Sequence, residues 1–176
     1  MMDVPKICLN MIVKNESAII IRLLESVTPL IDSYCICDTG STDNTITLIQ
    51  EYCESKNIPG KIIEESFRDF GYNRSYSLSE CTEMQNADYI LLMDADMRLE
   101  INTTNIEQFK RMLINDAYYV VQGCPNFYNE NIRIIRNDPS YHYWGVTHEY
   151  IELPDNAVIE NISKDILFIA DLIFFV

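Results

Sequence analysis

Short hydrophobic runs alternate with amphipathic segments along the first half of the chain. The runs are rich in aliphatic, aromatic and cysteine residues, which is typical of strands that are buried on both faces of a sheet. The runs cover residues 6–13, 31–37, 61–64 and 89–93. Between them, apolar residues recur at the spacing of one helix face, as Ile20, Leu23 and Val27 do. This alternation predicts an α/β fold, in which right-handed helical crossovers join the strands of a mostly parallel sheet.

Strands rather than helices dominate the second half of the sequence. One helix is expected after Thr103 or Thr104, and residues 117–122 and 132–136 then predict a strand pair. A last apolar run, residues 166–176, has the composition of a core strand. We therefore expect a single layered domain with a few antiparallel strands near its C-terminus, and we expect this domain to be one piece of a longer protein.

The composition of the chain argues against some classes of binding partner and indicates a cellular location. The chain of 176 residues has a formal net charge of −14, which argues against a nucleic-acid backbone as the main partner. The last apolar run is too short to span a bilayer and contains Asp171, so no integral membrane segment is expected. Six cysteines without zinc-site spacing, and no visible signal peptide, indicate a reducing, cytoplasmic location.

Two carboxylates follow the fourth hydrophobic run. Asp94 and Asp96 are separated by one alanine and lie where the strand over residues 89–93 ends. Two neighbouring acids repel each other unless a cation or a shared proton relieves them. Taken alone, the pair fits an acidic turn better than a site. The residues expected near this pair in the fold decide whether it is a turn or a functional site.

Polar residues also follow the first two hydrophobic runs. Asn15 and Glu16 come after the first, and Asp38 comes after the second. Because the carboxyl ends of parallel strands share one edge of a sheet, we expect these residues to meet Asp94 and Asp96 there. An acid after the second strand is a usual ligand for ribose or base groups, although Asp38 alone fits a turn equally well.

The sequence contains no glycine-rich dinucleotide fingerprint, no phosphate-binding loop of the Walker type and no Gly-x-Ser-x-Gly elbow. A bound phosphate would then depend on a metal at the Asp pair and on a basic residue. Arg74 is the best placed basic residue, because it follows a glycine-containing loop at an expected helix start. His148 can add a metal ligand, and Glu149 can add a proton acceptor. Neighbouring side chains of an extended segment point in opposite directions, so only one of the two would then face the metal. The alternative is a polar pair on a surface loop.

Five sequence blocks in the same order carry a resemblance to a known family. They read Met-Ile-Val-Lys-Asn-Glu, Asp-Thr-Gly-Ser-Thr-Asp-Asn-Thr, Asp-Phe-Gly-Tyr-Asn-Arg, Asp-Ala-Asp and Trp-Gly-Val-Thr-His-Glu. Together they resemble family 2 glycosyltransferases, in particular the branch with lipopolysaccharide-core glucosyltransferases and peptide S-glycosyltransferases. The resemblance implies the GT-A fold, a Rossmann-like layered sandwich, and an inverting transfer from a nucleotide-diphosphate sugar, most often a UDP-sugar, with Mn²⁺ or Mg²⁺.

The same resemblance implies a role for each candidate residue. The base and ribose would lie by Val13, Asn15, Glu16 and Asp38. Arg74 would lie by the nucleotide or its phosphates, Asp94 would face the ribose or the metal, and Asp96 would ligate the metal. His148 would be a further metal ligand and Glu149 the catalytic base. The acceptor would be a sugar, a lipid or a protein, and further domains or an oligomer are expected.

Two features depart from the family pattern, and two other functions stay open. Ser75 follows Arg74 where the family usually has asparagine, and Met97 stands where an acid is frequent. One alternative is a nucleotide-sugar-binding module without turnover. A sugar-1-phosphate nucleotidyltransferase would share the layered sheet and acidic metal site, but the first strand lacks its glycine-rich signature.

Overall fold

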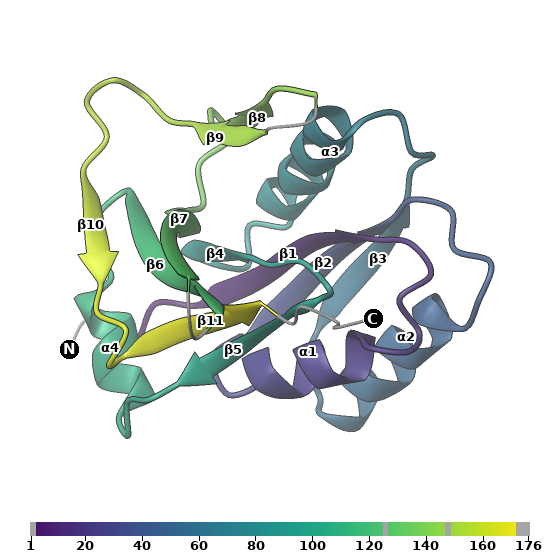
Figure 1. Cartoon of the computed structure of the whole chain (residues 1–176), viewed down its shortest axis with the longest axis horizontal. Helices are drawn as coiled ribbons and strands as arrows, with labels where there is room; N and C mark the ends of the chain where they lie inside the picture. Colours follow the sequence, from purple (N-terminus) through teal and green to yellow (C-terminus); the bar gives the residue numbers. More distant parts are fainter. Residues whose placement is uncertain (1–2, 125–126, 147–148, 172–176) are drawn as a thin grey trace.

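One nine-stranded sheet forms the centre of the fold within residues 3–124, 127–146 and 149–171, which are the part of the chain that the computed structural model describes. Figure 1 shows the sheet with α1 and α2 on one side and α3 on the other. The order of the strands is β3-β2-β1-β4-β7-β6-β11-β5, and β10 also pairs with β6. A second sheet consists of β8 and β9.

The strands and helices have the following bounds. The first group of strands is β1 (Ile7–Val13), β2 (Ser33–Asp38), β3 (Gly60–Glu64), β4 (Tyr89–Leu92), β5 (Met97–Ile101) and β6 (Ala117–Cys124). The second is β7 (Phe127–Arg136), β8 (His142–Trp144), β9 (Tyr150–Glu152), β10 (Ile159–Ile162) and β11 (Leu167–Asp171). The helices are α1 (Ile20–Val27), α2 (Thr45–Ser55), α3 (Phe70–Glu83) and α4 (Ile106–Met112).

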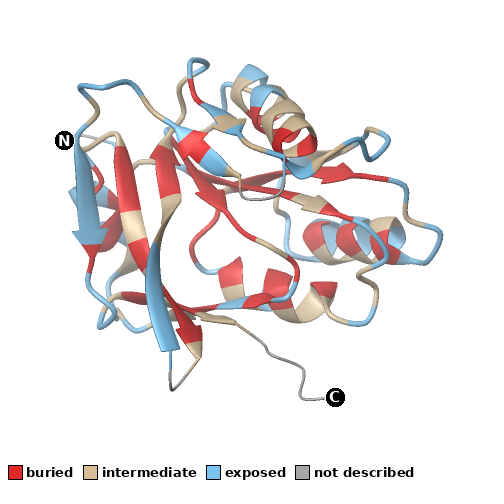
Figure 2. Cartoon of the chain, turned by 45° about the horizontal axis from the view of Figure 1, so that its top comes forward, coloured by how far each residue is buried: buried red, intermediate tan, exposed pale blue. Residues whose placement is uncertain are grey.

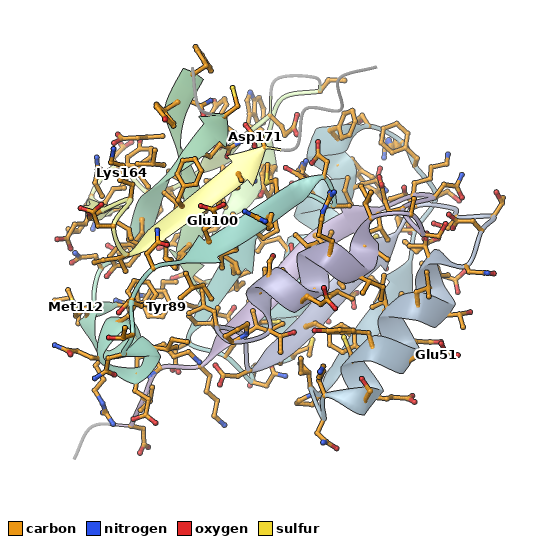
Figure 3. The ribbon with its side chains drawn as sticks, turned by 60° about the horizontal axis from the view of Figure 1, so that its bottom comes forward. Glu51, Tyr89, Glu100, Met112, Lys164 and Asp171 are labelled. Atoms are coloured by element: carbon orange, nitrogen blue, oxygen red, sulfur yellow. The ribbon has the colours of Figure 1, made fainter. Side chains whose placement is uncertain are left out.

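Parallel pairing joins the strands of the first half, as the sequence predicts. β3, β2, β1 and β4 are parallel neighbours, and β7 then pairs antiparallel with both β4 and β6. β10 and β11 occupy successive parts of one edge of β6, and β11 pairs antiparallel with β5. Figure 3 shows Asp171 at the end of β11, beside β5. The predicted α/β sheet with antiparallel strands near the C-terminus is therefore confirmed.

Side chains that alternate along β1 divide the core into two layers. Leu9 and Met11 belong to the cluster that includes α1 and α2, whereas Cys8 packs with Leu78 and Cys81 of α3. Buried residues accordingly follow the central strands, and exposed residues lie on the outer faces of the helices (Figure 2). Within the described residues, no helix is long and apolar enough to cross a membrane.

The start of α3 corrects one expectation. Arg74 was expected at a helix start after an irregular segment, but α3 begins at Phe70 and Arg74 lies inside it. The reason is a side-chain cap, because Asp69 has an extended backbone and its carboxylate accepts a hydrogen bond from the Tyr72 amide at 2.8 Å. The sequence also failed to predict β5, a short strand that follows Asp96 directly.

Replacement of Asp69 tests this cap. Asp69→Ala should lower the free energy of unfolding by about 1 kcal/mol, because the first turn of α3 loses its acceptor. Asp69→Asn is the matched control and should stay near the wild type, since asparagine caps as well as aspartate does. Denaturant titration measures both values. Equal stability of Asp69→Ala and the wild type would show that the cap does not set the helix start.

Candidate active site

The carboxyl ends of β1, β2 and β4 meet at one edge of the sheet and border a cleft of about 810 Å³. This donor-side cleft is also lined from α3 by Arg74 and from β11 by Asp171. Several residues singled out in the sequence lie together in its wall. They are Val13, Glu16, Arg74, Asp94 and Asp96. The predicted convergence at the strand ends is therefore present in the structure.

Asn15 and Asp38 shape the turn behind this cleft. Asn15 has a positive φ of 57°, and its side-chain oxygen accepts a hydrogen bond from the Thr42 amide at 2.7 Å. Asp38 Oδ2 accepts from the amides of Gly40 and Ser41 at 2.9 and 2.8 Å. The other oxygen, Asp38 Oδ1, is buried and has no hydrogen-bond partner among the described residues. Neither Asn15 nor Asp38 is among the residues that line the cleft, so both support its wall from behind.

Asp94 lies between two arginines. Arg74 Nη2 is 2.5 Å from Asp94 Oδ1, and Arg133 Nη1 is 3.3 Å from Asp94 Oδ2. Burial acts to raise the pKa of Asp94, but the charges of Arg74 and Arg133 oppose it and hold that pKa below its usual value. Asp94 is thus a fixed anion whose two oxygens are both engaged by cations.

Asp96 has a different environment in the same cleft. Partial burial, followed by repulsion from Asp94 and Asp171, raises the pKa of Asp96. The pKa of Glu16 is raised as well, first by burial and then by Asp96 and Asp43. Glu16, Asp96 and Asp171 therefore place three mutually repelling carboxylates around one cleft, which Lys14 and Arg74 also line. A bound cation would relieve the repulsion between the carboxylates.

This donor set fits a hard divalent cation that a phosphorylated ligand helps to hold. Mg²⁺ sites of this kind use one or two carboxylates together with substrate phosphates, rather than a full cage of protein ligands. The described residues contain no group of three or more His, Cys, Asp or Glu side chains placed to hold a metal alone. His148, the further ligand expected from the sequence, lies outside the described residues.

Glu149 faces a second cleft, of about 540 Å³, on the other side of Arg74. Glu149 Oε1 accepts a hydrogen bond from Arg74 Nε at 2.9 Å, and only 17% of its side chain is exposed. Arg74 and Asp94 line both clefts. Arg74 therefore joins the carboxylates of the donor-side cleft to Glu149 in what we call the second cleft.

The segment that carries Glu149 is docked on α3. Ser75 Oγ accepts a hydrogen bond from the Tyr143 amide at 2.9 Å and donates one to the Tyr143 carbonyl at 3.1 Å. This gives Ser75, the departure from the family pattern, a local role. Gly71 permits close approach, because a Cβ there would lie 2.0 Å from the Gly145 carbonyl oxygen.

Gly71→Ala tests this docking. The added methyl group would meet backbone rather than a flexible side chain, so we expect a loss of about 1–3 kcal/mol in the free energy of unfolding. Hydrogen exchange should also increase in β8 and β9, because the segment must move away from α3. Ser79→Ala, an exposed position of the same helix, is the control and should change neither. Unchanged exchange in Gly71→Ala would show that the contact does not hold β8.

Arg133 is a site residue that the sequence analysis missed. It lies in β7, within the run Ile132-Arg133-Ile134-Ile135, and only 13% of its side chain is exposed. A charged residue inside an otherwise apolar strand is a signal that could have marked it, since buried charges are usually paired. Its partner Asp94 is 39 residues away, so the pairing itself depends on the tertiary fold.

Sequence comparison assigns the family. Residues 8–166 match the sequence model of the family described as Glycosyl transferase family 2. The chain belongs to glycosyl transferase family 2. This family 2 chain is 27% identical over 154 residues to the SPbeta prophage-derived glycosyltransferase SunS of Bacillus subtilis, a match that covers 84% of the chain and 35% of SunS. The chain spans about a third of the length of the curated relatives it matches.

Solved glycosyltransferases share the fold of the family 2 chain. The complex of Staphylococcus aureus TarS with UDP aligns with a TM-score of 0.52 at 18% identity, over 69% of this chain and 37% of that one. The mannosyltransferase PcManGT of Pyrobaculum calidifontis, in complex with GDP-Man and Mn²⁺, aligns with a TM-score of 0.57 at 15% identity, over 75% of this chain and 44% of that one. The fold is therefore the GT-A glycosyltransferase fold expected from the sequence.

Proposed function

We propose that the chain is the catalytic domain of an inverting, metal-dependent glycosyltransferase. Its donor is a nucleotide-diphosphate sugar, most simply a UDP-sugar, and its acceptor carries a hydroxyl or thiol group. The observation that carries the proposal is the position of Arg74. This arginine lies between a cleft with carboxylates suited to a metal–diphosphate and a cleft that contains a carboxylate suited to be a base.

The nucleotide would occupy the donor-side cleft. Val13 and Glu16, which line this cleft, would border the base and ribose together with Asn15, and Asp38 would bind the uridine. The UDP held by TarS, and the GDP-Man and Mn²⁺ held by PcManGT, support a nucleotide diphosphate as the ligand class. The base and sugar that this chain prefers depend on the hydrogen bonds within the cleft.

Asp96, with His148, would hold Mn²⁺ or Mg²⁺ beside the diphosphate. When bound, such a cation supplies positive charge that offsets the charge of the leaving group. Arg74 faces the same region and offers a second, fixed positive charge. Because both Asp94 oxygens already contact arginines, Asp94 would act mainly by fixing Arg74, and Asp96 is the stronger candidate for the metal.

Glu149 would remove the acceptor proton. The acceptor oxygen or sulfur forms a bond to the anomeric carbon, while the bond from that carbon to the diphosphate oxygen breaks and its electrons leave with the nucleotide. The acceptor proton passes to the Glu149 carboxylate. One displacement at the anomeric carbon inverts its configuration, so the chain needs no nucleophile of its own.

A donor screen tests the proposed function. The chain should release UDP from at least one UDP-sugar in the presence of Mn²⁺, faster when hydroxyl- or thiol-bearing acceptors are added, and mass spectrometry should show the acceptor heavier by one sugar. GDP-sugars form the comparison set. Binding of nucleotide sugars without release or transfer would instead indicate a binding module. Formation of a nucleotide sugar from a sugar 1-phosphate and UTP would indicate a nucleotidyltransferase.

A further inference from the structure

Arg133 has no role in the function proposed above, yet it is bonded directly to the centre of the site. We propose that Arg133 is a positioning residue for sugar transfer, which holds Asp94 and thereby fixes Arg74 between the donor diphosphate and Glu149. This inference rests on the proposed function of the site. It adds a residue from β7 to a machinery otherwise built from α3, the end of β4 and the segment before β9.

The side chain of Arg133 is fixed on several sides. Its Nη1 lies 3.3 Å from Asp94 Oδ2 and donates to the Leu92 carbonyl at 3.5 Å. Its Nε donates to Gln122 Oε1 at 2.9 Å, and Gln122 Nε2 donates in turn to Asp171 Oδ1 at 3.2 Å. A planar guanidinium with donors on several edges can satisfy all these acceptors at once. The chain of contacts runs from the second cleft to the donor-side cleft.

The charges of the group show why the second arginine matters. Arg74 and Arg133 carry two positive charges, and Asp94 and Glu149 carry two negative charges, so the four side chains are neutral together. Without Arg133, both carboxylates would share Arg74 alone. Asp94 Oδ2 would also lose its guanidinium partner in a largely buried site, which is costly. Asp94 would then be held by Arg74 alone, so the Arg74 guanidinium would be fixed less firmly through it.

The position of Arg74 gives this pairing a function. Arg74 contacts both Asp94 and Glu149 and lines both clefts, so its guanidinium is held beside the region where the donor diphosphate would lie. Negative charge on the diphosphate grows as its bond to the anomeric carbon breaks, and a guanidinium held in place stabilises that added charge. Electrostatic help that increases only in the transition state raises the turnover rate rather than the donor affinity. Arg133 should therefore affect kcat more than donor binding.

Arg136 supplies a matched control on the same strand. It also forms an ion pair, with Asp116 at 3.4 Å, but 41% of its side chain is exposed and it lies in neither cleft. A general structural effect of removing an arginine from β7 should appear in both variants. A positioning effect should appear only at Arg133.

The test compares Arg133→Gln, Arg133→Lys and Arg136→Gln in the Mn²⁺-loaded chain. We expect Arg133→Gln to lower kcat by ~10–100-fold, the range found when a group that orients a site residue is removed. UDP affinity by calorimetry and the KM for the donor should stay within about threefold of the wild type. Arg133→Lys keeps the charge and should recover part of the loss. Arg136→Gln should leave kcat unchanged. Equal losses in the two glutamine variants, or a fall in UDP affinity that matches the fall in kcat, would overturn the proposal.

A measurement without turnover separates this proposal from the proposed function. Arginine-selective ¹⁵N spectra should show a slowly exchanging Nε–H signal for Arg74, because Glu149 accepts that hydrogen bond. Arg133→Gln and Arg133→Lys should speed its exchange, the first more strongly, while Arg136→Gln should not. If the wild type transfers no sugar, the proposed function is wrong, but this spectrum still tests whether Arg133 holds Asp94 and Arg74 in place. An Arg74 signal that is unchanged in both Arg133 variants would contradict the positioning role.

Discussion

Asp96→Asn should lower the affinity for UDP in the presence of Mn²⁺ by at least ~100-fold. This loss is larger than the one usually found when a residue that only hydrogen-bonds to a metal ligand is replaced. Asparagine keeps the shape of the side chain but removes the charge that would hold the cation. The site depends on this charge because Asp94, the neighbouring acid, is already engaged by Arg74 and Arg133. Calorimetric titration of UDP at fixed Mn²⁺ measures the change.

The control for this variant is Asp165→Asn. Asp165 is an exposed residue of the turn before β11, at the end of that strand remote from Asp171. It should bind UDP as the wild type does. If Asp96→Asn kept the wild-type affinity and the same dependence on Mn²⁺, Asp96 would not be a metal ligand. The carboxylates of Glu16 and Asp171, which line the same cleft, would then be the ones to replace next.

Glu149→Gln should retain UDP binding and lower the rate of transfer by ~10²–10⁴-fold, the usual contribution of a positioned base. Glutamine still offers an oxygen to Arg74 Nε, so the docking of this segment should survive. What the variant loses is the capacity to take a proton. The measurements are kcat for sugar transfer and the dissociation constant of UDP, determined on the same preparation.

Glu51→Gln is the matched control, because Glu51 is exposed on α2 and lies in neither cleft (Figure 3). It should transfer sugar at the wild-type rate. Retained turnover in Glu149→Gln would assign the role of base to another group. A parallel loss of UDP affinity would indicate instead that Glu149 acts by holding Arg74.

The sheet could be predicted because its central strands are buried on both faces. β4, and β1 apart from Asn10, then appear in the sequence as apolar runs, and the polar residues just beyond them mark the edge where the cleft forms. The start of α3 was harder to predict. Phe67 and Phe70 are partly exposed and pack edge to face with each other, so they give no regular apolar stripe at the first turn.

The pairing inside the site could be predicted only in part. Asp96, Arg74 and Glu149 follow from motif order, and their roles as ligand, clamp and base stay predictions. The engagement of Asp94 by two arginines depends on how β7 lies against β4, which is an antiparallel pairing between distant segments. Arg133 is visible in the sequence as a charge in an apolar run, but its partner is set by that pairing.

The most direct test of the account is the binding of UDP to the unaltered chain with Mn²⁺ present and after its removal by a chelator. We expect saturable binding with Mn²⁺ that weakens more than about tenfold when the cation is removed and returns when it is restored. Affinity that is the same with and without the cation would contradict a metal–diphosphate site at Asp96. Absence of UDP binding under both conditions would contradict UDP as the nucleotide of the donor.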